Sequence, residues 1–163
     1  MLLKYFLFFF LFGFLGIFQS SFSALFNIMG ATVNFIFILF FLIVFFSGQS
    51  KVSFDWKIVF FSAVTAGFFS DVFLCTYFGT TTVFLLIIAF IFKKLISLLK
   101  GKRDKYPIVY FIPLFILAFL GFNLLQATLH FNWVFLIEII YNFVFAMLGY
   151  YIYKKFNLYE FSE

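Results

Sequence analysis

Two acidic side chains stand inside long apolar stretches of this sequence, and they are the residues best suited to chemistry. Asp71 is the one charge between Ile58 and Phe92, and Glu138 is the one charge between Tyr106 and Tyr153. An acid at the centre of a membrane helix costs about 2.5–3.5 kcal/mol on insertion scales, so each calls for a polar partner or a function. Two interpretations of Asp71 stay open: it lines a polar pocket, or it caps a helix end in contact with water.

Amide side chains extend this polar character along the predicted helices. Glu138 and Asn142 are four residues apart and share one helix face, and Asn123 and Gln126 form a similar face earlier in the chain. Such amides serve as hydrogen-bond partners between helices, at about 1 kcal/mol or less each, or they line a ligand pocket. The candidate polar intramembrane cluster comprises Asp71, Asn123, Gln126, Glu138 and Asn142.

Small residues precede Asp71 at helical spacing. Ala63, Gly67 and Asp71 are spaced by four, and Ser70 belongs to a parallel row of small side chains. Rows of this kind let another helix approach closely, so we interpret them as a packing seam rather than a ligand site. The predicted packing signature is Ala63, Gly67, Ser70 and Asp71.

The sequence offers few of the paired groups that catalysis needs. His130 is the one histidine and Cys75 the one cysteine, so no Ser-His-Asp set, histidine-rich metal cluster or Cys-x-x-Cys motif can be drawn. We therefore expect no enzyme activity, no cofactor and no metal. An intramembrane lipid-modifying enzyme is the least favoured alternative.

Composition indicates that lipid is the solvent for most of this chain. Of its 163 residues, 66% are hydrophobic and 10% are charged; soluble domains have about half and about a quarter. This excludes a soluble enzyme, a disordered chain, a nucleic-acid binder and a secreted disulfide scaffold. The 35 phenylalanines favour a coding bias that lipid tolerates over a dedicated aromatic binding surface.

Long stretches without charge predict an all-α fold with six transmembrane helices in a single domain over residues 1–163. The apolar runs are continuous, whereas barrel strands would alternate polar and apolar residues. The 46 residues between Lys4 and Lys51 carry no charge; as a helix they would span about 69 Å, more than twice the hydrocarbon core. That stretch therefore predicts two crossings, and so do the two later ones. The predicted helices are residues 4–22, 30–47, 56–74, 80–99, 108–126 and 132–153.

Basic residues predict the orientation. If the amino terminus lies inside, all 11 basic residues fall in cytoplasmic segments, as the positive-inside rule requires. We therefore expect a multi-pass protein of the inner membrane with both termini in the cytoplasm. The longest cytoplasmic loop is expected to contact anionic lipid, at about 1 kcal/mol per basic residue, with an acidic protein partner as the alternative. Its basic residues are Lys93, Lys94, Lys100, Lys102, Arg103 and Lys105.

The first segment also has features of a secretory signal, with small residues near Ser21–Ala24. Signal peptides have apolar regions of about 7–15 residues, and here the charge-free run continues through the second helix. We expect the first helix to be retained.

The order of these features is similar to that of a known family. The first helix ends in Gln19-Ser20-Ser21-Phe22, and the third carries Gly67-Phe68-Phe69-Ser70-Asp71-Val72-Phe73 followed by Phe78-Gly79. These segments resemble the rod shape-determining MreD family over residues 5–100. The family's Pro-Asp at the start of the second helix is replaced by Val33-Asn34.

The resemblance implies a non-enzymatic membrane subunit of the machinery that builds the lateral cell wall. Such subunits associate with the bitopic shape protein MreC and, through the complex, with the actin-like MreB, the elongation transpeptidase and the glycosyltransferase. By carry-over, Gly67 and Asp71 are the structural signature of the third helix, and neither is assigned a catalytic role.

The main alternative is a substrate-binding S component of an energy-coupling factor vitamin transporter. Such proteins have the same size and six helices, and an outward-facing pocket would use Asp71, Asn123, His130 and Glu138. The short external turns leave no long loop to close over a ligand, which favours the shape-complex subunit.

Overall fold

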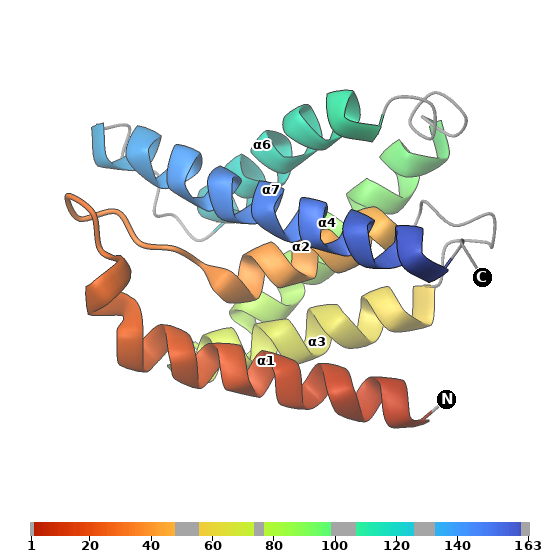
Figure 1. The fold of residues 1–163 in the computed structure, drawn as a ribbon. Coiled ribbons are helices and arrows are strands. Elements are labelled where there is room, and N and C mark those ends of the chain that lie inside the picture. Colours follow the sequence, from red (N-terminus) through yellow and green to blue (C-terminus); the bar gives the residue numbers. More distant parts are fainter. Residues whose placement is uncertain (1, 48–55, 74–76, 99–106, 126–132, 161–163) are drawn as a thin grey trace.

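A computed structural model describes residues 2–47, 56–73, 77–98, 107–125 and 133–160 of the chain (Figure 1). Within these residues the fold is all-helical and contains no β-strand, which confirms the predicted all-α class. The elements are α1 (Leu2–Phe22), the 3-10 helix η1 (Ser23–Phe26), α2 (Phe35–Ser47), α3 (Trp56–Phe73), α4 (Thr80–Leu98), α6 (Pro107–Leu125) and α7 (Trp133–Glu160).

Four of these helices are long and apolar enough to cross a membrane. The apolar windows are Tyr5–Phe22, Trp56–Phe73, Pro107–Leu124 and Trp133–Lys155. The outer surfaces of the helices are apolar as well: Phe6 on α1 and Ile140 on α7 are exposed by 61% and 63%. A surface of this kind suits lipid rather than water, and the chain is a helical membrane protein.

The short helix α2 occupies the centre of the bundle (Figure 1). It has 13 residues, all apolar except the last, and it packs against α1, α3, α6 and α7. A helix that is apolar on every side is buried when protein surrounds it. Accordingly, seven side chains of α2 are buried, from Ile36 to Phe45.

Phenylalanine rings form much of the contact between α2 and α6. Rings spaced by four residues line the facing sides of both helices and meet edge to face, with centroids 5.1–6.2 Å apart. Such aromatic pairs contribute about 0.5–1.5 kcal/mol beyond the area that they bury. The rings are Phe37, Phe41 and Phe45 on α2 and Phe111, Phe115 and Phe119 on α6.

Two predicted helix bounds are wrong. The second helix begins at Phe35 and not at residue 30, because residues 27–34 form a turn and an extended segment. The last helix continues to Glu160 rather than ending at 153, since hydropathy detects only the part of a helix that lies in lipid. The remaining bounds differ from the prediction by no more than two residues.

Basic residues collect at one end of the described structure. α1 and α3 both begin there, whereas α4 and α7 run the other way and end there (Figure 1). Lys57 lies in the first turn of α3, Lys93 and Lys94 lie near the end of α4, and Lys154 and Lys155 lie near the end of α7.

Candidate functional site: polar contacts at two helix starts

Asp71 binds the start of the next helix. It lies on the last turn of α3, is 3% exposed, and accepts hydrogen bonds through both carboxylate oxygens. The backbone N–H of Gly79 donates at 2.7 Å and that of Thr81 at 3.1 Å. These groups belong to the first turn of α4, where helix N–H groups have no partner within the helix. Asp71 therefore caps the start of α4 from the preceding helix. The sequence interpretation of a helix cap in contact with water differs from this arrangement, because the carboxylate is buried.

The turn before α4 needs its glycine. Gly79 has φ +91°, a left-handed conformation that side chains rarely adopt. Its carbonyl accepts from the N–H of Val83 at 3.0 Å, so Gly79 is the residue from which α4 starts. This conformation turns the N–H of Gly79 toward Asp71.

Gly67 lies where α3 and α4 come closest. A Cβ atom on Gly67 would lie 2.3 Å from Cα of Thr82 and 2.5 Å from its backbone nitrogen. Both atoms belong to the backbone of α4 and have no room to move aside. Only glycine permits the two helices to approach this closely.

The other residues of the packing signature are buried on the same helix. Ala63 is fully buried and Ser70 is 1% exposed. Together with Gly67 and Asp71 they lie on α3, which makes its most extensive helix contact with α4. The structure thus places all four signature residues in the interior of the bundle.

Asn142 makes a second polar contact, at the start of α2. It is fully buried on α7, and its side-chain oxygen accepts from the N–H of Asn34 at 2.8 Å. Its amide nitrogen donates to the carbonyl of Thr32 at 3.0 Å and to that of Glu138 at 2.9 Å. Asn142 therefore pairs with extended backbone on both sides of Val33, much as a neighbouring strand would.

Asn34 caps α2 directly. Its side-chain oxygen accepts from the N–H of Phe37 at 2.9 Å, and its carbonyl accepts from Ile38 at 3.0 Å. Gln19, near the end of α1, lies with its side-chain oxygen 3.5 Å from the N–H of Ile36. Sequence reasoning missed Asn34 as a cap, although an asparagine directly before an apolar run is a recognised helix-start signal.

A tight turn brings the chain back into the bundle before α2. Ile28 and Ala31 exchange two backbone hydrogen bonds of 2.9 and 3.0 Å, and Met29 and Gly30 both have positive φ. The side chain of Asn27 accepts from the N–H of Gly30 at 2.8 Å. Two consecutive positive φ values are typical of a type I′ turn, which reverses the chain between Ile28 and Ala31.

The predicted polar cluster is distributed over different contacts. Asp71 serves the start of α4, whereas Asn142 serves the start of α2. Asn123 is 8% exposed and donates to the carbonyl of Phe119 in its own helix at 2.9 Å. Glu138 is half-buried on α7, and its carbonyl is bound by Asn142. Gln126 and His130 lie outside the described residues.

These contacts position backbone rather than activate a reactant. Both oxygens of Asp71 and both ends of the Asn142 amide are engaged with the protein's own main chain. In the part of the chain that the structure describes, no group of three His, Cys, Asp or Glu side chains is placed to hold a metal ion. The arrangement fixes where two helices begin.

Part of the predicted basic loop is described. Lys93 and Lys94 are exposed near the end of α4, and Nζ of Lys93 lies 4.8 Å from the centre of the Trp56 ring. A cation over a tryptophan face at this distance is attracted by the ring. The rest of the loop, Lys100, Lys102, Arg103 and Lys105, lies outside the described residues.

Comparison with known proteins gives no match. No family model matches the chain, and no curated protein and no solved structure matches it either.

Proposed function

We propose that this protein is a non-enzymatic membrane subunit of the complex that elongates the lateral cell wall, similar to the MreD family. In this role it holds partner membrane proteins, among them an MreC-type bitopic protein, and links them to the peptidoglycan synthases. In this role the protein organises other proteins and catalyses no reaction.

The observation that carries this proposal is the position of the two motifs on which the resemblance rests. Gln19, in the motif that ends α1, lies at the first turn of α2. Asp71, in the motif of α3, binds the first turn of α4, beside the close contact of Gly67 with Thr82. Both motifs therefore contact the start of the following helix. This is a structural role, and it supports a non-enzymatic subunit.

The proposal includes six crossings with both termini in the cytoplasm. α2 has 13 residues, or about 20 Å of helix at 1.5 Å per residue. The extended residues 31–34 before it add about 13 Å at about 3.3 Å per residue. The sum is about 33 Å, enough for a hydrocarbon core of about 30 Å. α4 has 19 residues, or about 28 Å, and it would make a further crossing.

Localisation in the inner membrane follows from the same proposal. The basic ends of α3, α4 and α7 lie together (Figure 1), and the positive-inside rule would place this end in the cytoplasm. The basic loop that follows α4 would then face the cytoplasmic leaflet and its anionic lipids.

Depletion of the protein in the organism that makes it tests the role, because a subunit of this complex is required for rod shape. We expect the cells to become round within a few generations, and an affinity tag on the protein should co-purify the MreC-type partner. A matched control depletes the chain while a copy carrying Gly121→Ala is expressed, because a Cβ at Gly121 meets nothing within 4 Å. This copy should restore rods. Cells that stay rod-shaped without the protein would reject the proposal.

A further inference from the structure

Glu138 is an acid to which the structure gives no partner. It is half-buried on α7, and among the described residues its carboxylate makes no hydrogen bond and no ion pair. Only its backbone carbonyl is engaged, by Asn142. Asp71, in contrast, accepts two backbone hydrogen bonds. Acids inside membrane segments almost always pair with another group, so Glu138 calls for a group that is not yet in place.

The depth of Glu138 makes this requirement stronger. It lies within the apolar window of α7, five residues after Trp133, or about 7.5 Å along the helix. Trp133 is 82% exposed at the start of α7, and tryptophan at a helix end is typical of the level of the lipid headgroups. The carboxylate of Glu138 is therefore attached below that level, beside the hydrocarbon.

The chain itself does not bring a positive charge to Glu138. Residues 106–153 contain no lysine and no arginine. Lys154 follows on the same helix after 16 residues, or about 24 Å, and the other described lysines near helix ends lie at that same end of the bundle (Figure 1). A second copy in the same orientation would have its lysines at that end too. A cation for Glu138 must therefore come from a different molecule.

An apolar stripe runs along α7 from Glu138. Its residues are spaced by three and four, the spacing along which a second helix packs. Leu148 and Ile152 in this stripe are 52% and 57% exposed, whereas Ala146 and Tyr150, on the side of α7 that packs into the bundle, are buried. The stripe comprises Glu138, Tyr141, Phe145, Leu148 and Ile152.

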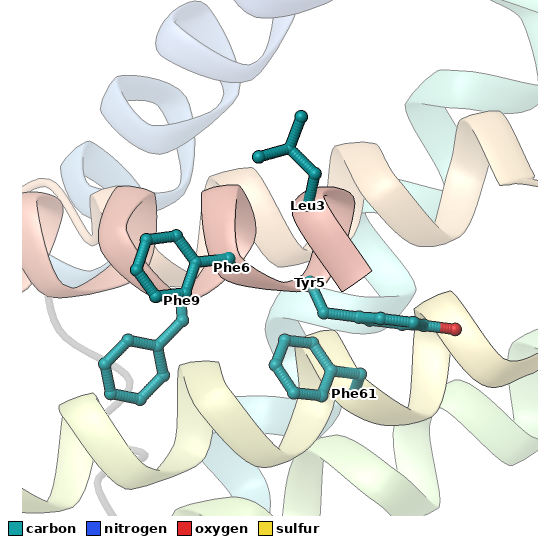
Figure 2. Close-up of a pocket in the computed structure, with 5 residues that line it drawn as sticks. All are labelled: Leu3, Tyr5, Phe6, Phe9 and Phe61. Carbon is teal, nitrogen blue, oxygen red and sulfur yellow. The ribbon is translucent and has the colours of Figure 1, made fainter. Parts of the chain in front are cut away.

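Apolar surface elsewhere on the bundle does not identify a partner. A groove between α1 and α3 is lined by Leu3, Tyr5, Phe6, Phe9 and Phe61 (Figure 2). The hydroxyl of Tyr5 points away from Phe6 and Phe9, so the groove is apolar. Lipid chains can fill such a groove without any specific partner. The stripe on α7 differs, because the acid at its end selects the molecule that covers it.

We infer that this stripe of α7 binds a transmembrane helix of another protein, and that a lysine or arginine of that helix pairs with Glu138. The heptad-like spacing fits a helix, and the cation supplies charge-assisted hydrogen bonds to the carboxylate. A bound metal ion fits less well, because hard cations take about six to eight oxygen ligands and the described residues hold no group of three ligating side chains. The ammonium of a zwitterionic lipid already has its own phosphate as counter-ion. The inference does not depend on a role in cell shape.

The purified protein tests whether the carboxylate is structural. Because Glu138 has no described partner within the chain, Glu138→Gln should leave the midpoint of unfolding in SDS mixed micelles unchanged. A lower midpoint would assign the carboxylate a partner inside the protein, such as His130, and would overturn the inference.

Charge reversal in native membranes tests the pair itself. The tagged full-length protein is purified in mild detergent from the organism that makes it, and the co-purifying membrane proteins are quantified by mass spectrometry. We expect Glu138→Gln to retain about tenfold less of one protein, a factor equal to about 1.4 kcal/mol and within the range for polar contacts between membrane helices. Glu160→Gln, which removes an equal charge from the other end of α7, should retain it fully.

The protein lost in this way must carry a lysine or arginine in a transmembrane helix, at the level of Glu138. Glu138→Lys should abolish its binding, and replacing its basic residue by glutamate should restore binding to Glu138→Lys but not to the wild type. Capture alone is not support, because only the reversed pair assigns the contact to Glu138.

Three further results would overturn the inference. They are retention of every membrane partner by Glu138→Gln, loss of a partner without a basic residue at that level, and failure of the reversed pair to restore binding. Native mass spectrometry checks the lipid alternative: an amine-bearing lipid that stays on the wild type and is lost from Glu138→Gln would assign the site to lipid instead. None of these results changes the outcome of the depletion experiment, so the two proposals fail separately.

Discussion

Asp71 shows how backbone N–H groups help to accommodate a carboxylate in an apolar environment. The N–H groups of Gly79, just before α4, and of Thr81, in its first turn, donate to it at 2.7 and 3.1 Å. Charged hydrogen bonds of this kind are about twice as strong as neutral ones. The start of a helix also carries a partial positive charge, which favours an anion by about 0.3–2 kcal/mol. These terms offset the insertion cost of the acid, so its presence requires no ligand.

Removing this cap should weaken the fold measurably. We expect Asp71→Ala to lower the free energy of unfolding by about 2 kcal/mol, the upper value for loss of a helix cap. Asp71→Asn keeps one acceptor oxygen and should cost about half as much. Unfolding in mixed micelles of increasing SDS content measures both. An Asp71→Ala protein as stable as the wild type would show that the cap contributes nothing.

Gly67 provides a test of close helix approach at a single position. Gly67→Ala places a methyl group 2.3 Å from the backbone of Thr82, so α3 and α4 must separate. We expect a loss of about 1–3 kcal/mol, the usual range for overpacking. Gly121→Ala on α6 is the matched control, because nothing lies within 4 Å of its Cβ. That change should be neutral or stabilising by up to about 1 kcal/mol, and equal losses for the two variants would contradict the contact.

At the scale of elements, α2 differs from its neighbours because an extended segment, residues 31–34, leads into it. Backbone that is not helical is tolerated at membrane depth only where protein satisfies its polar groups. Asn142 does this for Thr32 and Asn34, while Ala31 and Val33 are 1% and 3% exposed. The extended segment therefore depends on one side chain of α7.

Replacing Asn142 tests this dependence. Asn142→Leu has similar volume but leaves the N–H of Asn34 and the carbonyl of Thr32 without these partners. Each unsatisfied group costs about 1–3 kcal/mol, so we expect a loss of about 3 kcal/mol in SDS unfolding. Ser20→Ala, which removes an exposed hydrogen bond within α1, should change the stability by less than about 0.5 kcal/mol. Stability of Asn142→Leu within that same limit would show that the extended segment holds without α7.

The elements differ in how well the sequence predicts them. The α3–α4 pair was predicted closely, because charges and a Phe-Gly turn bound both helices within a few residues of sequence. The start of α2 was predicted wrongly, because the partner of its extended segment is 108 residues away. Hydropathy cannot separate an extended apolar segment from a helical one. The sequence also placed Asp71 and Asn142 in one candidate cluster, because it does not show which helix start each side chain contacts; the structure gives them separate partners.

At the scale of the whole molecule, the two ends of the bundle differ in charge. The described lysines near the helix ends lie at one end, while the turns at Met29 and Tyr77 precede α2 and α4 at the other. An electrical potential and anionic lipids both favour the basic end inside. The fold is therefore suited to one orientation in the membrane.

Cysteine labelling tests that orientation. In a Cys75→Ser background, Tyr77→Cys should react with a membrane-impermeant maleimide in intact cells whose outer barrier is opened, because Tyr77 is 87% exposed. Lys155→Cys should react only after the inner membrane is permeabilised. Labelling of Lys155→Cys from outside would reverse the orientation, and the proposed cytoplasmic contacts of the basic loop would fail with it.

The contact between Asn142 and Asn34 has a consequence for biosynthesis. The ribosome makes Asn142 108 residues after Asn34, which at about 5–20 residues per second is a delay of about 5–20 s. During this interval the segment that contains α2 has been made, but Asn142, which binds the backbone before α2, has not. Until α7 has been made, the insertion machinery must keep the polar backbone of that segment out of lipid, or the segment must form a longer helix. A chain that ends before α7 would therefore also lack the side chain that binds the backbone of Thr32 and Asn34.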